Sequence, residues 1–177
     1  MRSQYLVLGL LVVLLGGVAA AQPPPDRSKR PSPPGTAEVT LAGEKIVIDY
    51  SRPSLRGRKM ESLTPSGHVW RTGANEATAL FLEADLQIGD VTIPAGHYTL
   101  YTLPSAGPWK LIINKQTGQW GTVYNPDQDL ARVDMQTTRL SHPVEQFTIV
   151  FRQKGADTAE LVLQWETTEV SVPVSVK

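Results

Sequence analysis

The sequence predicts an all-β protein with one folded domain, built as an antiparallel two-sheet sandwich of the jelly-roll or immunoglobulin-like kind. Apolar and polar residues alternate with a period of two along most of the chain, which is typical of half-buried strands. Turn-forming residues interrupt these runs, and no window keeps the 3.6-residue period of an amphipathic helix beyond about one turn. About ten short strands in a domain of this length favour two packed sheets.

The first 21 residues have the pattern of a secretory signal peptide. Met1-Arg2 gives a positive start, residues 6–18 are almost wholly apolar, and residues 19–21 are alanines of the kind that a signal peptidase reads. The apolar run is shorter than the ~20 residues that span a bilayer. We therefore expect cleavage near Ala21, a periplasmic or secreted protein, and no stable membrane insertion after cleavage. An uncleaved N-terminal anchor is the alternative.

Residues 22–35 form a proline-rich segment. Six of its 14 residues are proline, with Asp26, Arg27, Lys29 and Arg30 among them. Proline fixes φ and removes a backbone donor, so this composition predicts an extended, disordered linker. The folded domain is then expected over residues 36–177.

The first half of the domain consists of alternating runs separated by turns. We expect strands over residues 39–41, 46–50, 77–84, 86–88, 91–93 and 97–103. Gly89-Asp90 between two of these runs is a strong hairpin signal, because glycine accepts the positive φ that a tight turn needs. Pro94-Ala95-Gly96 predicts the next turn.

The second half alternates more regularly. We expect strands over residues 109–113, 132–136, 147–152, 161–165 and 170–174. The expected core anchors are large apolar residues, each contributing about 1.5–3 kcal/mol when buried: Phe147, Ile149, Phe151, Leu161, Leu163 and Trp165. Pro173 lacks a ladder donor and predicts an edge or a bulge in the last strand.

Composition narrows the function. There is no cysteine, which excludes disulfides, cysteine-ligated zinc, iron–sulfur clusters and thiol nucleophiles. The formal net charge is zero, but four of the 17 basic residues and one of the 17 acidic residues precede residue 36, so the domain is mildly acidic. Nucleic-acid binding depends on many phosphate contacts and is not expected.

Irregular polar segments at residues 50–58 and 70–78 break the strand pattern and predict the site. Arg52, Arg58 and Arg71 stand there beside glycines and a proline. Guanidinium groups bind a carboxylate, phosphate or sulfate in a bidentate manner, so we expect a site for one small anion. The alternative is that these arginines pair with Asp49, Glu61 or Glu76 and fix the loops to the sheet.

Asn75 and Glu76 complete this set, with Trp70 as a wall. A carboxylate and a carboxamide can orient sugar hydroxyls, hold a hard cation or serve as a general acid or base. They can equally cap the free N–H groups of a turn. The ligand-binding residues that the sequence predicts are Arg52, Arg58, Trp70, Arg71, Asn75 and Glu76.

Other chemistries have weaker signals. His68, His97 and His142 match no metal-ligand spacing, and no serine lies in a G-x-S-x-G elbow, so no metal, cofactor or nucleophilic triad is expected. Among the other tryptophans, Trp109 and Trp165 fit the apolar phase of their strands. Trp120, between Gly118 and Gly121, is the best candidate for an exposed aromatic ring.

The motif W-R-T-G-A-N-E-A-T at residues 70–78 is specific. Together with Ser51-Arg52-Pro53, Gly57-Arg58, Pro94-Ala95-Gly96 and Trp120-Gly121, it resembles the DUF2911 family of exported bacterial proteins. The resemblance covers essentially the whole domain and implies the same fold and site position, but no established activity. His68 and His97 stand where the family pattern does not call for histidine.

The first functional hypothesis is a binding module for a small anionic or carbohydrate ligand. The alternatives are a structural or surface-assembly domain, and a hydrolase with Glu76 as its acid or base. β-Sandwich domains host all three kinds of function. The sequence leaves catalysis and oligomeric state open.

Overall fold

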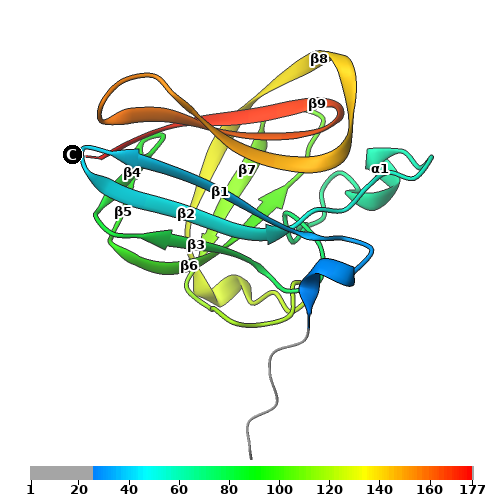
Figure 1. Ribbon diagram of the computed structural model, residues 1–177, viewed down its shortest axis with the longest axis horizontal. Coiled ribbons are helices and arrows are strands. Elements are labelled where there is room, and N and C mark those ends of the chain that lie inside the picture. The colour runs from blue at the N-terminus through cyan, green and yellow to red at the C-terminus, as the bar shows by residue number, and fades with distance from the viewer. Residues whose placement is uncertain (1–25, 177) are drawn as a thin grey trace, which may run out of the picture.

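The computed structural model describes residues 26–176. The predicted signal peptide, residues 22–25 of the predicted linker and Lys177 lie outside the described residues. Nine strands form one continuous antiparallel sheet in the order β1-β2-β3-β6-β7-β8-β9-β4-β5. Their bounds are β1 Pro34–Leu41, β2 Glu44–Ser51, β3 Thr78–Leu82, β4 Leu86–Ile88, β5 Val91–Ile93, β6 Gly96–Leu103, β7 Trp109–Asn114, β8 Asp129–Gln153 and β9 Thr158–Val176 (Figure 1).

Helical structure in residues 26–176 is limited to three short segments. They are the 3-10 turn η1 (Arg27–Lys29), the helix α1 (Met60–Leu63) and the 3-10 turn η2 (Pro126–Gln128). In this part of the chain, no helix has both the length and the apolar character that crossing a bilayer would demand. The all-β prediction is confirmed.

The long strands β8 and β9 connect everything into one sheet. β8 pairs with β7 as far as Met135 and with β9 from Gln136 onward. The β8–β9 register shifts between Arg139 and Val144 and again before Thr148. Such bulges bend a strand without ending it. The sequence predicts separate strands on the two sides of this bend, and two separate sheets are not confirmed because pairing runs through all nine strands.

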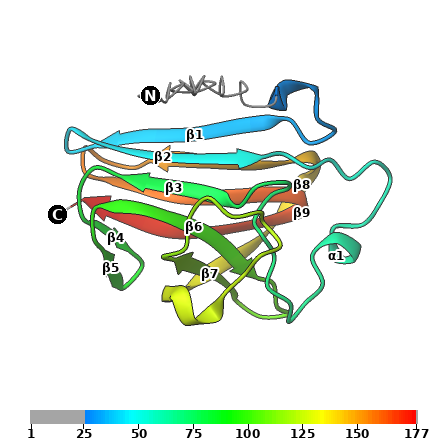
Figure 2. The ribbon, with the colours of Figure 1, turned by 90° about the horizontal axis from the view of Figure 1, so that it is seen from below.

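The bent sheet folds over on itself. Figure 1 shows β8 and β9 lying across the layer that contains β1, β2 and β3, and Figure 2 shows the same strands stacked in the turned view. Tyr50 of β2 links the two layers, because its hydroxyl accepts a hydrogen bond from Ile149 N of β8 at 2.9 Å. An isolated bridge between Ser54 and Gln146 joins the same two regions.

The core fills the space between the layers. One cluster of buried apolar side chains contains residues of both, including Ile48, Leu80 and Leu100 on one side and Leu161 on the other. Of the predicted anchors, Phe147, Ile149, Leu161, Leu163 and Trp165 are buried, whereas Phe151 is only partly buried. The alternation of apolar residues therefore identified the core-facing side of strands such as β2 and β3, whereas residues 111–114 of β7 are buried on both faces.

Pro173 shows how the sheet accommodates a missing donor. It lies in β9 opposite Gly89, whose N–H donates to the Pro173 carbonyl at 2.9 Å. Proline cannot return that bond, and Gln87 Nε2 donates to the Gly89 carbonyl at 3.1 Å instead. Gly89 belongs to the turn that follows β4, so Pro173 lies just beyond the β4–β9 pairing. β9 itself lies between β8 and β4 without a register shift at Pro173, so the predicted edge strand or bulge is not confirmed.

Candidate functional site

The 70–78 segment begins as a buried turn. Trp70 exchanges both backbone hydrogen bonds with Thr102 of β6, at 2.8 and 2.9 Å. Thr72 is fully buried with φ of 52°, an unusual conformation for a β-branched residue. The Thr78 hydroxyl donates to the Thr72 carbonyl at 2.8 Å and fixes the turn. A Cβ at Gly73 would stand 2.9 Å from the Ser51 carbonyl oxygen, so only glycine fits there.

Trp70 belongs to an aromatic cluster between the layers. Its ring stacks on Trp165 at a centroid distance of 5.4 Å and meets Phe147 edge-on at 4.8 Å. Trp109 and Trp165 are buried as the sequence predicts, and Trp120 is the exposed tryptophan, with 49% of its surface accessible. Trp70 therefore has a packing role in the core in addition to its place in the motif.

Arg52 and Arg58 bind protein groups rather than an open hollow. Arg52 donates to the Phe147 carbonyl at 3.3 Å and to Thr148 Oγ1 at 2.9 Å, which ties β2 to β8. Arg58 donates to the carbonyls of Leu55 and Ser54 at 2.9 and 3.1 Å, which closes its own loop. The structure gives these two arginines loop-fixing contacts.

The predicted arginine–carboxylate pairs do not form. Among residues 26–176, no ion pair involves Arg52, Arg58 or Arg71. Asp49 and Glu76 are instead paired with Arg27 and Arg30, which precede the domain boundary that the sequence predicts. The carboxylates were expected as partners, but their cations come from the proline-rich segment.

Asn75 and Glu76 face this N-terminal segment. Asn75 has φ of 61°, which asparagine tolerates, and its Nδ2 donates to the Ser32 carbonyl at 3.3 Å. Arg30 Nη1 donates to Glu76 Oε2 at 2.7 Å, and this contact holds the pKa of the Glu76 carboxyl below its usual value. A general acid needs the opposite shift.

Residues 26–33, hereafter the arm, differ from the solvated linker that the sequence predicts. Residues 27–29 form η1, and Asp26 caps this turn by accepting from Ser28 N at 3.0 Å. The arm then runs along the loop regions into β1. Its composition predicts disorder, but composition carries no information on whether a complementary surface exists elsewhere in the chain.

Arg71 is the one predicted arginine that lines an open hollow. The hollow has a volume of about 300 Å³, and its walls come from the end of α1 and the segment after it, from β6 and from the β7–β8 connection. The lining residues are Leu63, Val69, Trp70, Arg71, Tyr101, Gly121, Thr122 and Tyr124. Of the predicted site residues, the structure brings together only Trp70 and Arg71 at this Arg71 hollow.

The Arg71 guanidinium is partly buried without a counter-charge in the described residues. Its Nε donates to the Gly73 carbonyl at 3.3 Å, and burial lowers its pKa from the usual value. No described side chain hydrogen-bonds to its two Nη atoms, and neither is sealed from solvent. A guanidinium held in this way presents two donors to a ligand in the hollow.

Two tyrosines, Tyr101 and Tyr124, also line the hollow and were missed by sequence reasoning. Tyr101 donates to the Val123 carbonyl at 2.9 Å, and its ring meets that of Tyr124 at a centroid distance of 4.8 Å. Tyr124 donates to Asp129 Oδ2 at 2.6 Å, and burial together with this carboxylate raises the pKa of Tyr124 to about 12. Both phenols remain protonated at neutral pH. Tyr101 looked like an ordinary strand residue, and no local pattern marked Tyr124.

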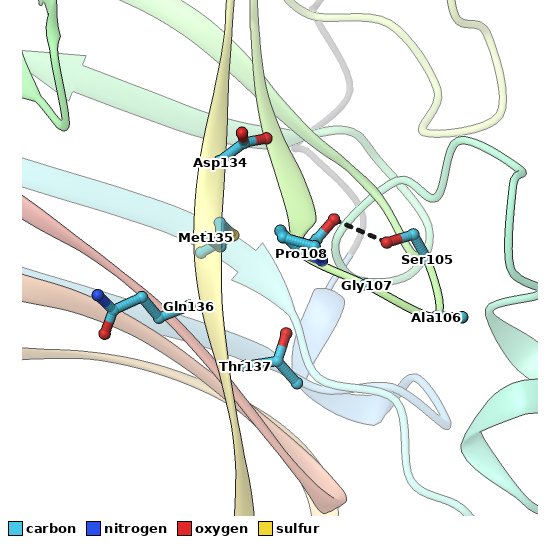
Figure 3. Close-up of a pocket in the computed structure, with 8 residues that line it drawn as sticks. All are labelled: Ser105, Ala106, Gly107, Pro108, Asp134, Met135, Gln136 and Thr137. Atoms are coloured by element: carbon cyan, nitrogen blue, oxygen red, sulfur yellow. Dashed lines mark hydrogen bonds between the residues drawn. The ribbon is translucent and has the colours of Figure 1, made fainter.

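A larger hollow of about 570 Å³ lies elsewhere on the surface, between the 105–108 loop and β8 (Figure 3). Its one ionisable side chain, Asp134, is paired with Lys110, and the Ser105 hydroxyl donates to the Pro108 carbonyl at 2.7 Å. The hollow thus offers the Gln136 amide and the Thr137 hydroxyl, but no charged side chain without a partner among the described residues. In residues 26–176, no group of three or more acidic, histidine or cysteine side chains is placed to hold a metal ion.

The comparisons with known proteins give one result. A family model described as "Protein of unknown function (DUF2911)" matches residues 32–174. No curated protein and no solved structure matches the chain. The matched range includes the folded domain up to β9 and starts inside the arm.

Proposed function

We propose that this chain, which belongs to the DUF2911 family, is a binding module that takes a small anionic ligand in the Arg71 hollow. The observation that carries the proposal is the Arg71 guanidinium, partly buried at the hollow without an ion-pair partner in residues 26–176. Arg52 and Arg58 each use Nε and Nη2 to bind backbone carbonyls or a hydroxyl. Of the three predicted arginines, Arg71 is the one that lines a hollow and has no hydrogen-bond partner for either Nη atom among residues 26–176.

The energetics favour an anion. Removing a charged group from water is costly unless a partner of opposite charge compensates it. A carboxylate, phosphate or sulfate group in the hollow would supply that charge and accept two parallel N–H bonds from Arg71. The Coulomb attraction is larger in a partly buried hollow than at an open surface.

The shape favours a ligand with a ring. Trp70 and Tyr124 present aromatic surface, the buried Tyr101 also lines the hollow, and Thr122 adds a hydroxyl at the wall. Aromatic walls with a few placed polar groups are the usual composition of small-molecule sites. A sugar acid combines the ring and the carboxylate and unites the two ligand classes that the sequence suggests. Glu76 does not line the hollow, so the hydrolase alternative gains no support from this geometry.

Ligand-dependent thermal stability tests the proposal. The protein starting at Gln22 is heated with inorganic phosphate, sulfate, short carboxylates and uronic acids, and a binder raises the midpoint in proportion to the logarithm of its concentration. Arg71→Gln should abolish the shift while the unliganded protein stays folded. Arg58→Gln is the matched control, since Arg58 lies outside the hollow, and it should leave the shift unchanged.

Two outcomes contradict the proposal. One is that no anion of the series shifts the midpoint at millimolar concentration. The other is that Arg71→Gln and Arg58→Gln respond equally to the ligand, which would place binding elsewhere.

The proposal includes export, on the strength of the N-terminal sequence. Cleavage near Ala21 would leave Gln22 as the first residue of the mature protein. N-terminal sequencing of the protein from the periplasmic and medium fractions is the test. A mature chain that still begins at Met1 would contradict it.

A further inference from the structure

The arm is held by the kind of backbone hydrogen bonds that proteins use to bind extended peptides. Three consecutive carbonyls of the arm accept hydrogen bonds from the domain: Arg56 Nη2 donates to Pro31 O at 2.9 Å, Asn75 Nδ2 to Ser32 O at 3.3 Å, and Arg52 N to Pro33 O at 2.8 Å. Bonds to successive carbonyls hold a backbone regardless of its side chains. Such bonds provide affinity in complexes with extended peptides.

Two charged side chains add specificity. Arg27 Nη1 donates to Asp49 Oδ2 at 2.8 Å, and Arg30 Nη1 donates to Glu76 Oε2 at 2.7 Å. Arg27 Nε also lies 3.9 Å from Glu76 Oε2, so one carboxylate faces both cations. The two arginines are three residues apart, one at the start of η1 and the other at its C-cap, and both reach the surface that carries Asp49 and Glu76. We call this surface the seat; it consists of Asp49, Arg52, Arg56, Asn75 and Glu76.

Proline makes the arm a suitable ligand for such a seat. Pro31 and Pro33 fix φ near the extended value and lower the entropy that binding must remove. Recognition modules for proline-rich segments use this preorganised, extended backbone. The arm combines such prolines with the two arginines that pair with Asp49 and Glu76.

We propose that the seat is a binding site for basic, proline-rich peptides with two arginines three residues apart, and that the arm fills it in cis. A separate peptide of the same chemistry fills the seat when the arm is released. The attached arm acts as a competitor at an effective concentration in the millimolar range. The seat is distinct from the Arg71 hollow, since none of its five residues lines that hollow.

Fluorescence anisotropy with a labelled peptide tests this inference. The peptide copies residues 26–34, and the protein starts at Gln22. In Arg27→Gln/Arg30→Gln protein the arm loses both ionic anchors, so the peptide should bind at least tenfold more tightly than to the unaltered protein. Lys29→Gln is the control, because Lys29 is exposed and pairs only with Asp26, and it should leave the seat closed.

Seat variants complete the design. Adding Glu76→Gln or Asp49→Asn to the Arg27→Gln/Arg30→Gln protein should lower its affinity for the peptide at least tenfold. Thermal unfolding checks that each variant is folded. A peptide with glutamine at both arginine positions should not bind. Arg71→Gln should bind the peptide normally, which separates this result from the fate of the anion proposal.

The inference is overturned if the arm variant and the unaltered protein bind the peptide equally, or if neither binds it. The inference is also overturned if adding Glu76→Gln or Asp49→Asn leaves peptide binding as tight as in the Arg27→Gln/Arg30→Gln protein. The peptide would then bind at another surface.

Discussion

Gly121 lies against the side chain of Arg71 so closely that a Cβ added at residue 121 would stand 2.6 Å from Arg71 Cδ. The same Cβ would lie 2.8 Å from the Asn75 carbonyl oxygen, which accepts a hydrogen bond from Gly121 N at 2.9 Å. The Gly121 backbone therefore packs against the Asn75 backbone on one side and against the Arg71 side chain on the other. This packing sets the position of Arg71 in the hollow.

Gly121→Ala should displace the Arg71 side chain and lower stability by about 1–3 kcal/mol, the usual cost of overpacking. Urea unfolding measures the stability, and titration with the best anion measures the loss of the site. Gly107→Ala is the control, because the nearest atom to an added Cβ there is 3.9 Å away. Equal effects of the two substitutions would show that Gly121 does not position Arg71.

Tyr50→Phe should destabilise the protein by about 1–3 kcal/mol, since the Ile149 N–H would lose its acceptor inside the core. The ring itself remains, and its edge-on contact with Phe147 at 5.7 Å is kept. Denaturant unfolding measures the difference. Tyr98→Phe, which removes an exposed bond to the Pro94 carbonyl, should change stability much less. If Tyr50→Phe left the free energy of unfolding unchanged, the packing of the two layers would not depend on this hydrogen bond.

Glu169→Gln should cost about 1–3 kcal/mol. Both Nη atoms of Arg152 donate hydrogen bonds to the Glu169 carboxylate, at 2.7 and 2.6 Å. Gln164 Nε2 donates a third, at 2.6 Å. Glu169 is buried, so the loss is not made up by water. Asp134→Asn is the control, because the Lys110–Asp134 pair is exposed and such pairs contribute little. Equal unfolding midpoints for the two variants would contradict the expectation.

The Glu76 contact should depend on pH in a defined direction. The hydrogen bond from Arg30 lowers the pKa of Glu76 from its ordinary value of 4.5, so the folded state favours the ionised carboxylate. The stabilisation is fully present above 4.5 and disappears as pH falls through the lower folded-state pKa. Unfolding curves of the unaltered protein and Glu76→Gln should differ at pH 6 and converge in acid. A difference that grows on acidification would reverse this sign.

The sequence indicated where along the chain the site lies, but not how its side chains are arranged in space. The glycines and prolines around Arg71 and Glu76 showed that the sheet is interrupted there, and the structure places a buried turn at that point. The hydrogen-bond acceptors close to each arginine decide which guanidinium group can bind a ligand, and the sequence does not show these acceptors. Arg52 and Arg58 meet carbonyls, whereas Arg71 faces a hollow whose tyrosines come from distant strands and loops.

The period-two alternation by itself determined that the chain builds strands of an all-β fold and, for strands such as β2 and β3, which side faces the core. These properties follow from local sterics and from the removal of apolar side chains from water. Only the tertiary structure decided that β8 and β9 bend as continuous strands, and that Arg27 and Arg30 bind Asp49 and Glu76. Charge pairing between distant segments depends on three-dimensional separation, which the order of residues along the chain does not specify.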